Sequence, residues 1–178
     1  MADLKRYTIT AITFHWLLAL MITTSFFVGN YMADLPLSIL RLKLFNWHKW
    51  AGISILALSA LRLLWRLTHR PPPDLPGPAW QQRVAHLVHG LLYLLFFAVP
   101  LVGWAYSSAS GFPVVVFGVL PLPDFVPVSR QLAAALKPLH GILAWTLAVL
   151  VLLHSVAALK HHFIDRDRLL ERMLPGRG

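Results

Sequence analysis

The chain carries nine histidines and no cysteine, so imidazole is its main chemical resource. Four histidines, His15, His48, His140 and His154, lie inside or at the ends of long apolar stretches. Ionisable side chains in a membrane-like setting are costly to bury and usually serve a function. The lack of cysteine excludes disulfides, thiolate chemistry, iron–sulfur ligation and the thioether attachment of a c-type haem.

The spacing of His140 and His154 places both rings on one face of a helix. Fourteen residues at about 100° each come within about 40° of a whole number of turns, and the rings lie about 21 Å apart along the axis. One helix could therefore hold two haem irons stacked across a bilayer. Helix rise places His48 at the depth of His140, and His15 at the depth of His154. We predict two b haems, with His15 and His154 on the inner iron and His48 and His140 on the outer iron.

The residues around these histidines suit electron transfer. Two axial histidines leave no open iron position, which favours electron transfer over oxygen binding. Arg62 follows His48 by fourteen residues on the same face, so we expect it to point towards the inner haem and pair with a propionate. Gly29, Gly52 and Gly141 would let a flat macrocycle approach the backbone.

Other readings of the histidines stay open. His89 lies at inner-haem depth and competes for the inner iron, and the role of its neighbour His86 is not assigned. A buried histidine can also simply bond to a neighbouring helix. Zinc sites and proton relays use histidine too, but zinc gathers its ligands at one depth. No aspartate or glutamate lies inside an apolar stretch to complete either kind of site.

His161 is a further candidate, in the segment LKHHF. It follows His154 by seven residues, close to the same helix face and nearer the cytoplasm. We predict that it bonds a quinone carbonyl and, with His162, supplies protons, because histidine changes charge near neutral pH. We expect basic residues such as Lys160 to border this site. The alternative is a basic interfacial tail.

Four apolar stretches must position these residues, and each is long enough to cross a bilayer as a helix. No alternation of period two runs through them, which disfavours a β-barrel. We predict an all-α fold, an integral membrane four-helix bundle, as a single domain over residues 1–178. The predicted spans are about 7–32, 47–67, 84–106 and 138–159.

The connecting segments differ in character. Ser38 is expected to cap a short amphipathic helix in the first loop, and Ser129 another in the third loop. The second loop, RPPPDLPGP, should be stiff and non-helical. The third loop is long and apolar, so it could be a lid over the outer haem or a docking patch.

Composition and charge support a membrane protein. The chain is 57% hydrophobic and 13% charged, with a net charge of +9. In a membrane protein such charge reports topology and contact with anionic lipid rather than nucleic-acid binding. Basic residues divide unevenly between the two sides, which predicts that both termini and the proline-rich loop are cytoplasmic. The inner group is Lys5, Arg6, Arg62, Arg66, Arg70, Arg83, Lys160, Arg166, Arg168, Arg172 and Arg177, and the outer group is Arg41, Lys43, Lys49, Arg130 and Lys137.

Longer motifs add a resemblance that covers essentially the whole chain. They are FHW around His15, HKWAGISIL and RLLWRL from His48 onward, AHLVHGLLYLLFFAVPLVG, LHGILAW, and LLHSVAALKHHF. Together they resemble the bacterial cytochrome b561 family. The resemblance implies a four-helix di-haem protein of the inner membrane that exchanges electrons with ubiquinone. It implies axial ligation by the four histidines predicted above and places His161 at a position associated with quinone binding.

Two functions follow from this resemblance. Single-subunit relatives look like superoxide oxidases, which implies an enzyme that passes electrons from periplasmic superoxide to ubiquinone. Lys49, Lys137 and Arg130 would attract the anion to the outer haem. The alternative is an electron-transfer membrane anchor for a redox partner protein, a hydrogenase or dehydrogenase. A histidine-lined transporter is disfavoured by the lack of membrane carboxylates and inverted repeats.

Overall fold

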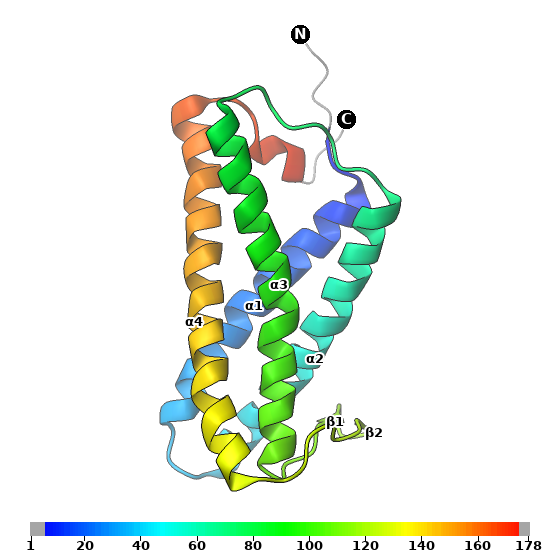
Figure 1. The fold of residues 1–178 in the computed structure, drawn as a ribbon, viewed down its shortest axis with the longest axis vertical. Helices are drawn as coiled ribbons and strands as arrows, with labels where there is room; N and C mark the ends of the chain where they lie inside the picture. Colours follow the sequence, from blue (N-terminus) through cyan, green and yellow to red (C-terminus); the bar gives the residue numbers. More distant parts are fainter. Residues whose placement is uncertain (1–5, 175–178) are drawn as a thin grey trace.

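The computed structural model describes residues 6–174 and contains four long helices, as the sequence predicts. All four are long and apolar enough to span a membrane, and each runs from one end of the molecule towards the other, with α1 oblique to α3 and α4 (Figure 1). A small antiparallel hairpin joins the third helix to the fourth. The elements are α1 (Ile9–Asp34), α2 (Ile39–Thr68), α3 (Ala79–Ala109), β1 (Val115–Val116), β2 (Leu120–Pro121), α4 (Arg130–Lys160), a π-helical turn (His161–Asp165) and a 3-10 turn (Leu170–Met173).

Polar caps set where three helices begin. The hydroxyl of Thr8 accepts a bond from the backbone N–H of Ala11, and Ser38 and Ser129 cap α2 and α4 in the same way. The two short loop helices predicted after these serines are wrong as separate elements. Each is the first part of a long helix, because no break separates the capped turn from the apolar span. Pro138 lies inside α4 without ending it, because a membrane helix tolerates the loss of one backbone hydrogen bond.

The packing leaves α1 and α4 largely apart. Helix α1 packs along α2, α3 packs along α4, and α2 joins the two pairs through α3. Contacts between α1 and α4 are few. An apolar cluster fills the middle of the bundle, and the predicted ligand histidines lie before and after it along the helices. Its buried members are Leu18, Ile22, Ile55, Leu92, Leu95, Phe96 and Leu147.

The two ends of the bundle differ. At one, the terminal end, an Nη2 N–H of Arg6 donates to the carbonyl of Leu174 over 2.8 Å, so the first and last described residues meet. At the other, the hairpin end, lies the loop that contains β1 and β2 (Figure 1). Lys5 and Arg177, assigned to the inner side from the sequence, lie outside the described residues.

The third loop is folded rather than extended. Phe117 and Gly118 form its turn with φ angles of 52° and 73°, in the left-handed region. Two bonds attach the loop to α2: the indole N–H of Trp50 donates to the Val115 carbonyl over 2.6 Å, and Lys49 Nζ donates to the Pro113 carbonyl over 3.2 Å. The loop is thereby fixed next to His48.

Candidate functional site

At the hairpin end, His48 of α2 faces His140 of α4. Their ring centres lie 6.1 Å apart. A metal–imidazole bond is about 2 Å and a ring centre lies about 1 Å behind its nitrogen, so two imidazoles on opposite sides of one metal ion would place their centres about 6 Å apart. The spacing therefore suits axial ligation of a single iron.

Hydrogen bonds orient both rings of this pair. Nδ1 of His140 lies 3.1 Å from the carbonyl oxygen of Val99, which can only accept, so this nitrogen carries the proton. Nδ1 of His48 lies 3.2 Å from the hydroxyl of Ser25, which can accept in the same way. Nε2 of each ring then keeps its lone pair for a metal. Partners of this kind are the usual way in which proteins fix a ligating histidine.

Hollow space lies on two sides of the His48–His140 pair. One cavity of about 430 Å³ extends from the pair towards mid-bundle, to Leu147 and Ser155. A second, of about 670 Å³, extends towards the hairpin end and reaches Trp104. Both histidines line both cavities. A flat macrocycle held between the two rings would need room on both sides of the ring-to-ring axis, and these cavities offer it.

At the terminal end, three histidines meet instead of two. His15 of α1 and His154 of α4 have ring centres 6.1 Å apart, the same spacing as in the first pair. His89 of α3 lies closer to His154, at 5.3 Å. The structure thus brings together the pair predicted from helix depth and also the competitor. The assignment of His15, rather than His89, to the inner iron stays a prediction.

Arg62 lies against this terminal cluster. One of its Nη2 N–H groups reaches Nδ1 of His15 at 3.2 Å, and its guanidinium lies over the Tyr93 ring. Since arginine only donates, Nδ1 of His15 accepts here and the ring proton is on Nε2. Ligation through Nε2 would require the other tautomer and a new partner for Arg62. A haem propionate, as the sequence predicts, would be such a partner.

His161 begins the π-helical turn after α4, and its backbone N–H still bonds the Ala157 carbonyl, so it keeps the helical register with His154. Its Nδ1 lies 2.5 Å from Asp167 and 3.3 Å from Asp165. Lys160, expected to border the site, pairs with Asp165 over 2.6 Å. A carboxylate accepting from Nδ1 would leave Nε2 of His161 available to a ligand. Neither aspartate was predicted from the sequence; the spacing of four residues between His161 and Asp165 was a signal, whereas no helical spacing indicates Asp167.

Glycines lie directly against both histidine rings of the hairpin-end pair, and the sequence predicted only one of these glycines. A Cβ atom on Gly103, which the sequence analysis missed, would lie 2.8 Å from Cε1 of His140. A Cβ atom on Gly29 would lie 3.0 Å from Cε1 of His48. Gly29 therefore gives clearance to a histidine ring. Gly52 lines both cavities beside the His48–His140 pair, and a Cβ atom on Gly141 would meet nothing within 4 Å.

Comparison with known proteins gives a consistent family. The sequence profile described as "Prokaryotic cytochrome b561" matches residues 6–176. Cytochrome b561 homolog 2 of Escherichia coli (strain K12) is 37% identical over 172 residues, 96% of this chain and 92% of that protein. A protein of Yersinia pestis named "Probable superoxide oxidase CybB" is 33% identical over 173 residues, 96% of this chain and 97% of its own length.

Gly103 provides a test of the hairpin-end pair. Gly103→Ala should force the His140 ring to shift, because the new Cβ atom would lie 2.8 Å from it. If this pair binds haem, the variant should lose or weaken the haem at the hairpin end and keep the one at the terminal end. The measurement is the visible spectrum of the purified variant. Leu101→Ala, on the exposed side of the same helix, is the control and should leave the spectrum unchanged. An unchanged Gly103→Ala spectrum would contradict the ligand role of His140.

Proposed function

The chain belongs to the prokaryotic cytochrome b561 family, and from this premise we propose that it is a di-haem superoxide:ubiquinone oxidoreductase. Family membership makes it a membrane b-type cytochrome. The observation that supports two haems is the repetition of one geometry: a histidine pair at each end with ring centres 6.1 Å apart. Haem, when bound, supplies the one-electron chemistry that links a one-electron donor to a quinone.

Ubiquinone takes up two electrons and superoxide donates one, so two superoxide anions react for each ubiquinone. Two superoxide anions, one ubiquinone and two protons give two molecules of dioxygen and one ubiquinol. Two histidines would hold each haem, so superoxide would donate its electron without becoming a ligand. The similarity to the Yersinia pestis protein supports this choice of donor.

The chain's own residues would assist at both ends. At the hairpin end, Arg130 and Lys137 are exposed on the first turns of α4, which leads to His140. Cations there would raise the local concentration of a small anion. We assign the hairpin end to the periplasm and the terminal end to the cytoplasm, because the terminal end carries most of the basic residues.

At the terminal end, His161 would contact the quinone. Asp167, by accepting from Nδ1, would hold the ring so that Nε2 faces the quinone carbonyl, and it would stabilise the ring when it carries a proton. The cavity lined by Arg62 and Arg66 does not include His161, so the proposed quinone contact does not require these arginines.

An anchor subunit for a redox partner protein is the second candidate. It is favoured by one observation, the exposed apolar tip of the third loop, where Phe117 is 67% and Val119 83% exposed. Large exposed apolar patches often mark protein contacts. The two functions differ in whether the isolated chain reacts with superoxide.

The first test is therefore stopped-flow reduction of the purified protein by superoxide, with and without ubiquinone. We expect a second-order rate that falls as salt rises, because exposed charges are screened beyond about 8 Å at physiological ionic strength. Arg130→Glu with Lys137→Glu should slow this reduction but not reduction by a neutral donor. Lys49 is left unchanged because it holds the third loop.

The control for that experiment is Arg83→Glu with Arg166→Glu. It makes the same change in net charge with residues that the sequence assigns to the opposite side of the membrane. It should leave the superoxide rate unchanged. A wild-type rate no faster than spontaneous dismutation would reject the enzyme and favour the anchor subunit.

The second test concerns quinone. His161→Ala should keep the haem spectrum and lower the rate of ubiquinone reduction by about a hundredfold, the typical contribution of a positioned acid or base. Asp167→Asn should lower the rate by a smaller factor. Asp74→Asn is the matched control, because Asp74 bonds His86 over 2.9 Å in a second His–Asp pair. If Asp74→Asn slows quinone reduction while His161→Ala and Asp167→Asn do not, the quinone site lies at His86 instead.

A further inference from the structure

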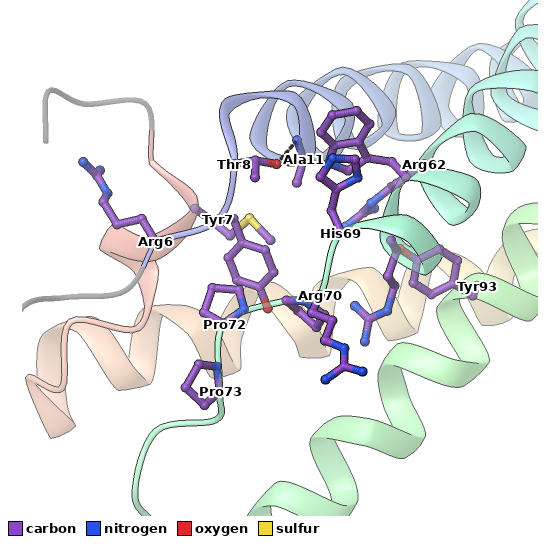
Figure 2. A pocket seen from close by; sticks show the side chains of 14 residues that line it. Arg6, Tyr7, Thr8, Ala11, Arg62, His69, Arg70, Pro72, Pro73 and Tyr93 are labelled. Carbon is purple, nitrogen blue, oxygen red and sulfur yellow. Dashed lines mark hydrogen bonds between the residues drawn. The ribbon is translucent and has the colours of Figure 1, made fainter.

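A cavity of about 420 Å³ lies at the terminal end, between the start of α1, the end of α2, the proline-rich loop and α3 (Figure 2). Four arginines line it, and three of these are Arg62 and Arg66 from α2 and Arg70 from the loop that follows. Arg6 also belongs to its wall but bonds the carbonyls of Glu171 and Leu174, and in Figure 2 its side chain extends away from the other labelled residues.

The charge of this arginine pocket is not balanced within its wall. None of the 14 described residues that line it is an aspartate or glutamate. The guanidinium groups of Arg62 and Arg66 lie over the ring of Tyr93, at 5.4 and 5.8 Å. Within the described part of the chain, neither Arg66 nor Arg70 has a carboxylate partner. Arg66 and Arg70 therefore bring two positive charges to the pocket with no carboxylate bonded to them, and such charges attract an anion.

The remaining polar groups of the pocket also favour an acceptor-rich ligand. The hydroxyl oxygen of Thr8 accepts from the Ala11 N–H and from the indole N–H of Trp65, which leaves its own proton to donate. His69 stacks on Trp65 with ring centres 3.7 Å apart, and these rings give the pocket an aromatic wall. Guanidinium and hydroxyl donors beside an apolar wall suit a phosphate group attached to an apolar body.

Arg66 and Arg70 lie farther from the histidine cluster than Arg62, which separates them from the predicted haem site. Arg62 contacts His15 and so belongs to the histidine cluster. Arg66 lies one turn nearer the end of α2, about 6 Å along the axis. Arg70 lies beyond the helix, which ends at Thr68. Arg66 and Arg70 are both exposed, at the mouth of the pocket, where the headgroup layer of a membrane would lie.

We propose that this arginine pocket binds a phosphate-class anion, the headgroup phosphate of an anionic phospholipid in the leaflet at the terminal end. Arg66 and Arg70 would bond the phosphate oxygens, and Thr8 would add one donor. Basic pockets between helices on the cytoplasmic side of membrane proteins bind lipid headgroups by this chemistry. The proposal does not depend on superoxide or quinone as substrates.

The test uses the full-length protein with its haems, purified in detergent and titrated with phosphatidylglycerol, with phosphatidylcholine as the neutral comparison. Native mass spectrometry counts bound lipid. We expect one phosphatidylglycerol per chain to bind much more tightly than phosphatidylcholine. Arg66→Gln with Arg70→Gln should weaken this binding by about tenfold or more, because bonds to charged groups are among the stronger ones. Arg70→Gln alone, outside the helix, should weaken it less and serves if the double variant does not fold.

The control is Arg83→Gln with Arg166→Gln, which removes the same charge outside the pocket. Equal weakening by both double variants would mean diffuse surface attraction and would overturn the proposal. Loss of haem from the Arg66→Gln, Arg70→Gln protein would also overturn it, because the arginines would then belong to the haem site. A further arm adds inorganic phosphate. Displacement of the lipid at millimolar phosphate would mean that the pocket binds free phosphate, and it would overturn the proposal that the ligand is a lipid headgroup.

Discussion

Inward-facing residues in two of the helices recur every seven positions, and this spacing is close to two turns of an α-helix. In α4 it aligns His140, Leu147 and His154, and in α2 it aligns His48, Ile55 and Arg62. Each face therefore has polar chemistry near both ends and a buried apolar residue between them. The heights of the histidine pairs, the apolar middle and the proximity of Arg62 to His15 all depend on this spacing.

Each inward-facing imidazole also needs hydrogen-bond partners for its ring nitrogens. In the hairpin-end pair, Ser25 lies against Nδ1 of His48 and the Val99 carbonyl against Nδ1 of His140, so neither uses Nε2. The terminal cluster differs, with Arg62 bonded to His15 and a third histidine near His154. The two ends therefore differ in how far they are prepared for a metal. The Val99 carbonyl places the proton of His140 on Nδ1, as ligation through Nε2 would need, whereas ligation by His15 through Nε2 would require Arg62 to move away.

Sequence could predict the features that depend on one helix at a time. Apolar length gave the four spans, and residue spacing gave the depths at which His15 meets His154 and His48 meets His140, because rise and turn per residue are nearly constant. Helices α2 and α4 begin before the predicted spans, because the turns capped by Ser38 and Ser129 continue directly into the apolar part of each helix.

Features that depend on how helices face one another were not predictable in this way. Gly103 lies on α3 and gives clearance to a ring on α4, and no spacing within α3 reveals that contact. Asp167 reaches His161 only because a π-helical turn and left-handed residues, among them Arg166, fold the tail back. The hairpin attached to Trp50 is likewise a contact between distant segments.

The most direct measurement is the number of b haems per polypeptide, determined from the haem absorbance and the protein concentration of the purified chain. We expect two for the wild type, one for His140→Ala, one for His15→Ala and two for His89→Ala. One haem in the wild type would contradict the repeated-pair geometry. Two haems in His15→Ala together with one in His89→Ala would show that α3, not α1, completes the terminal pair.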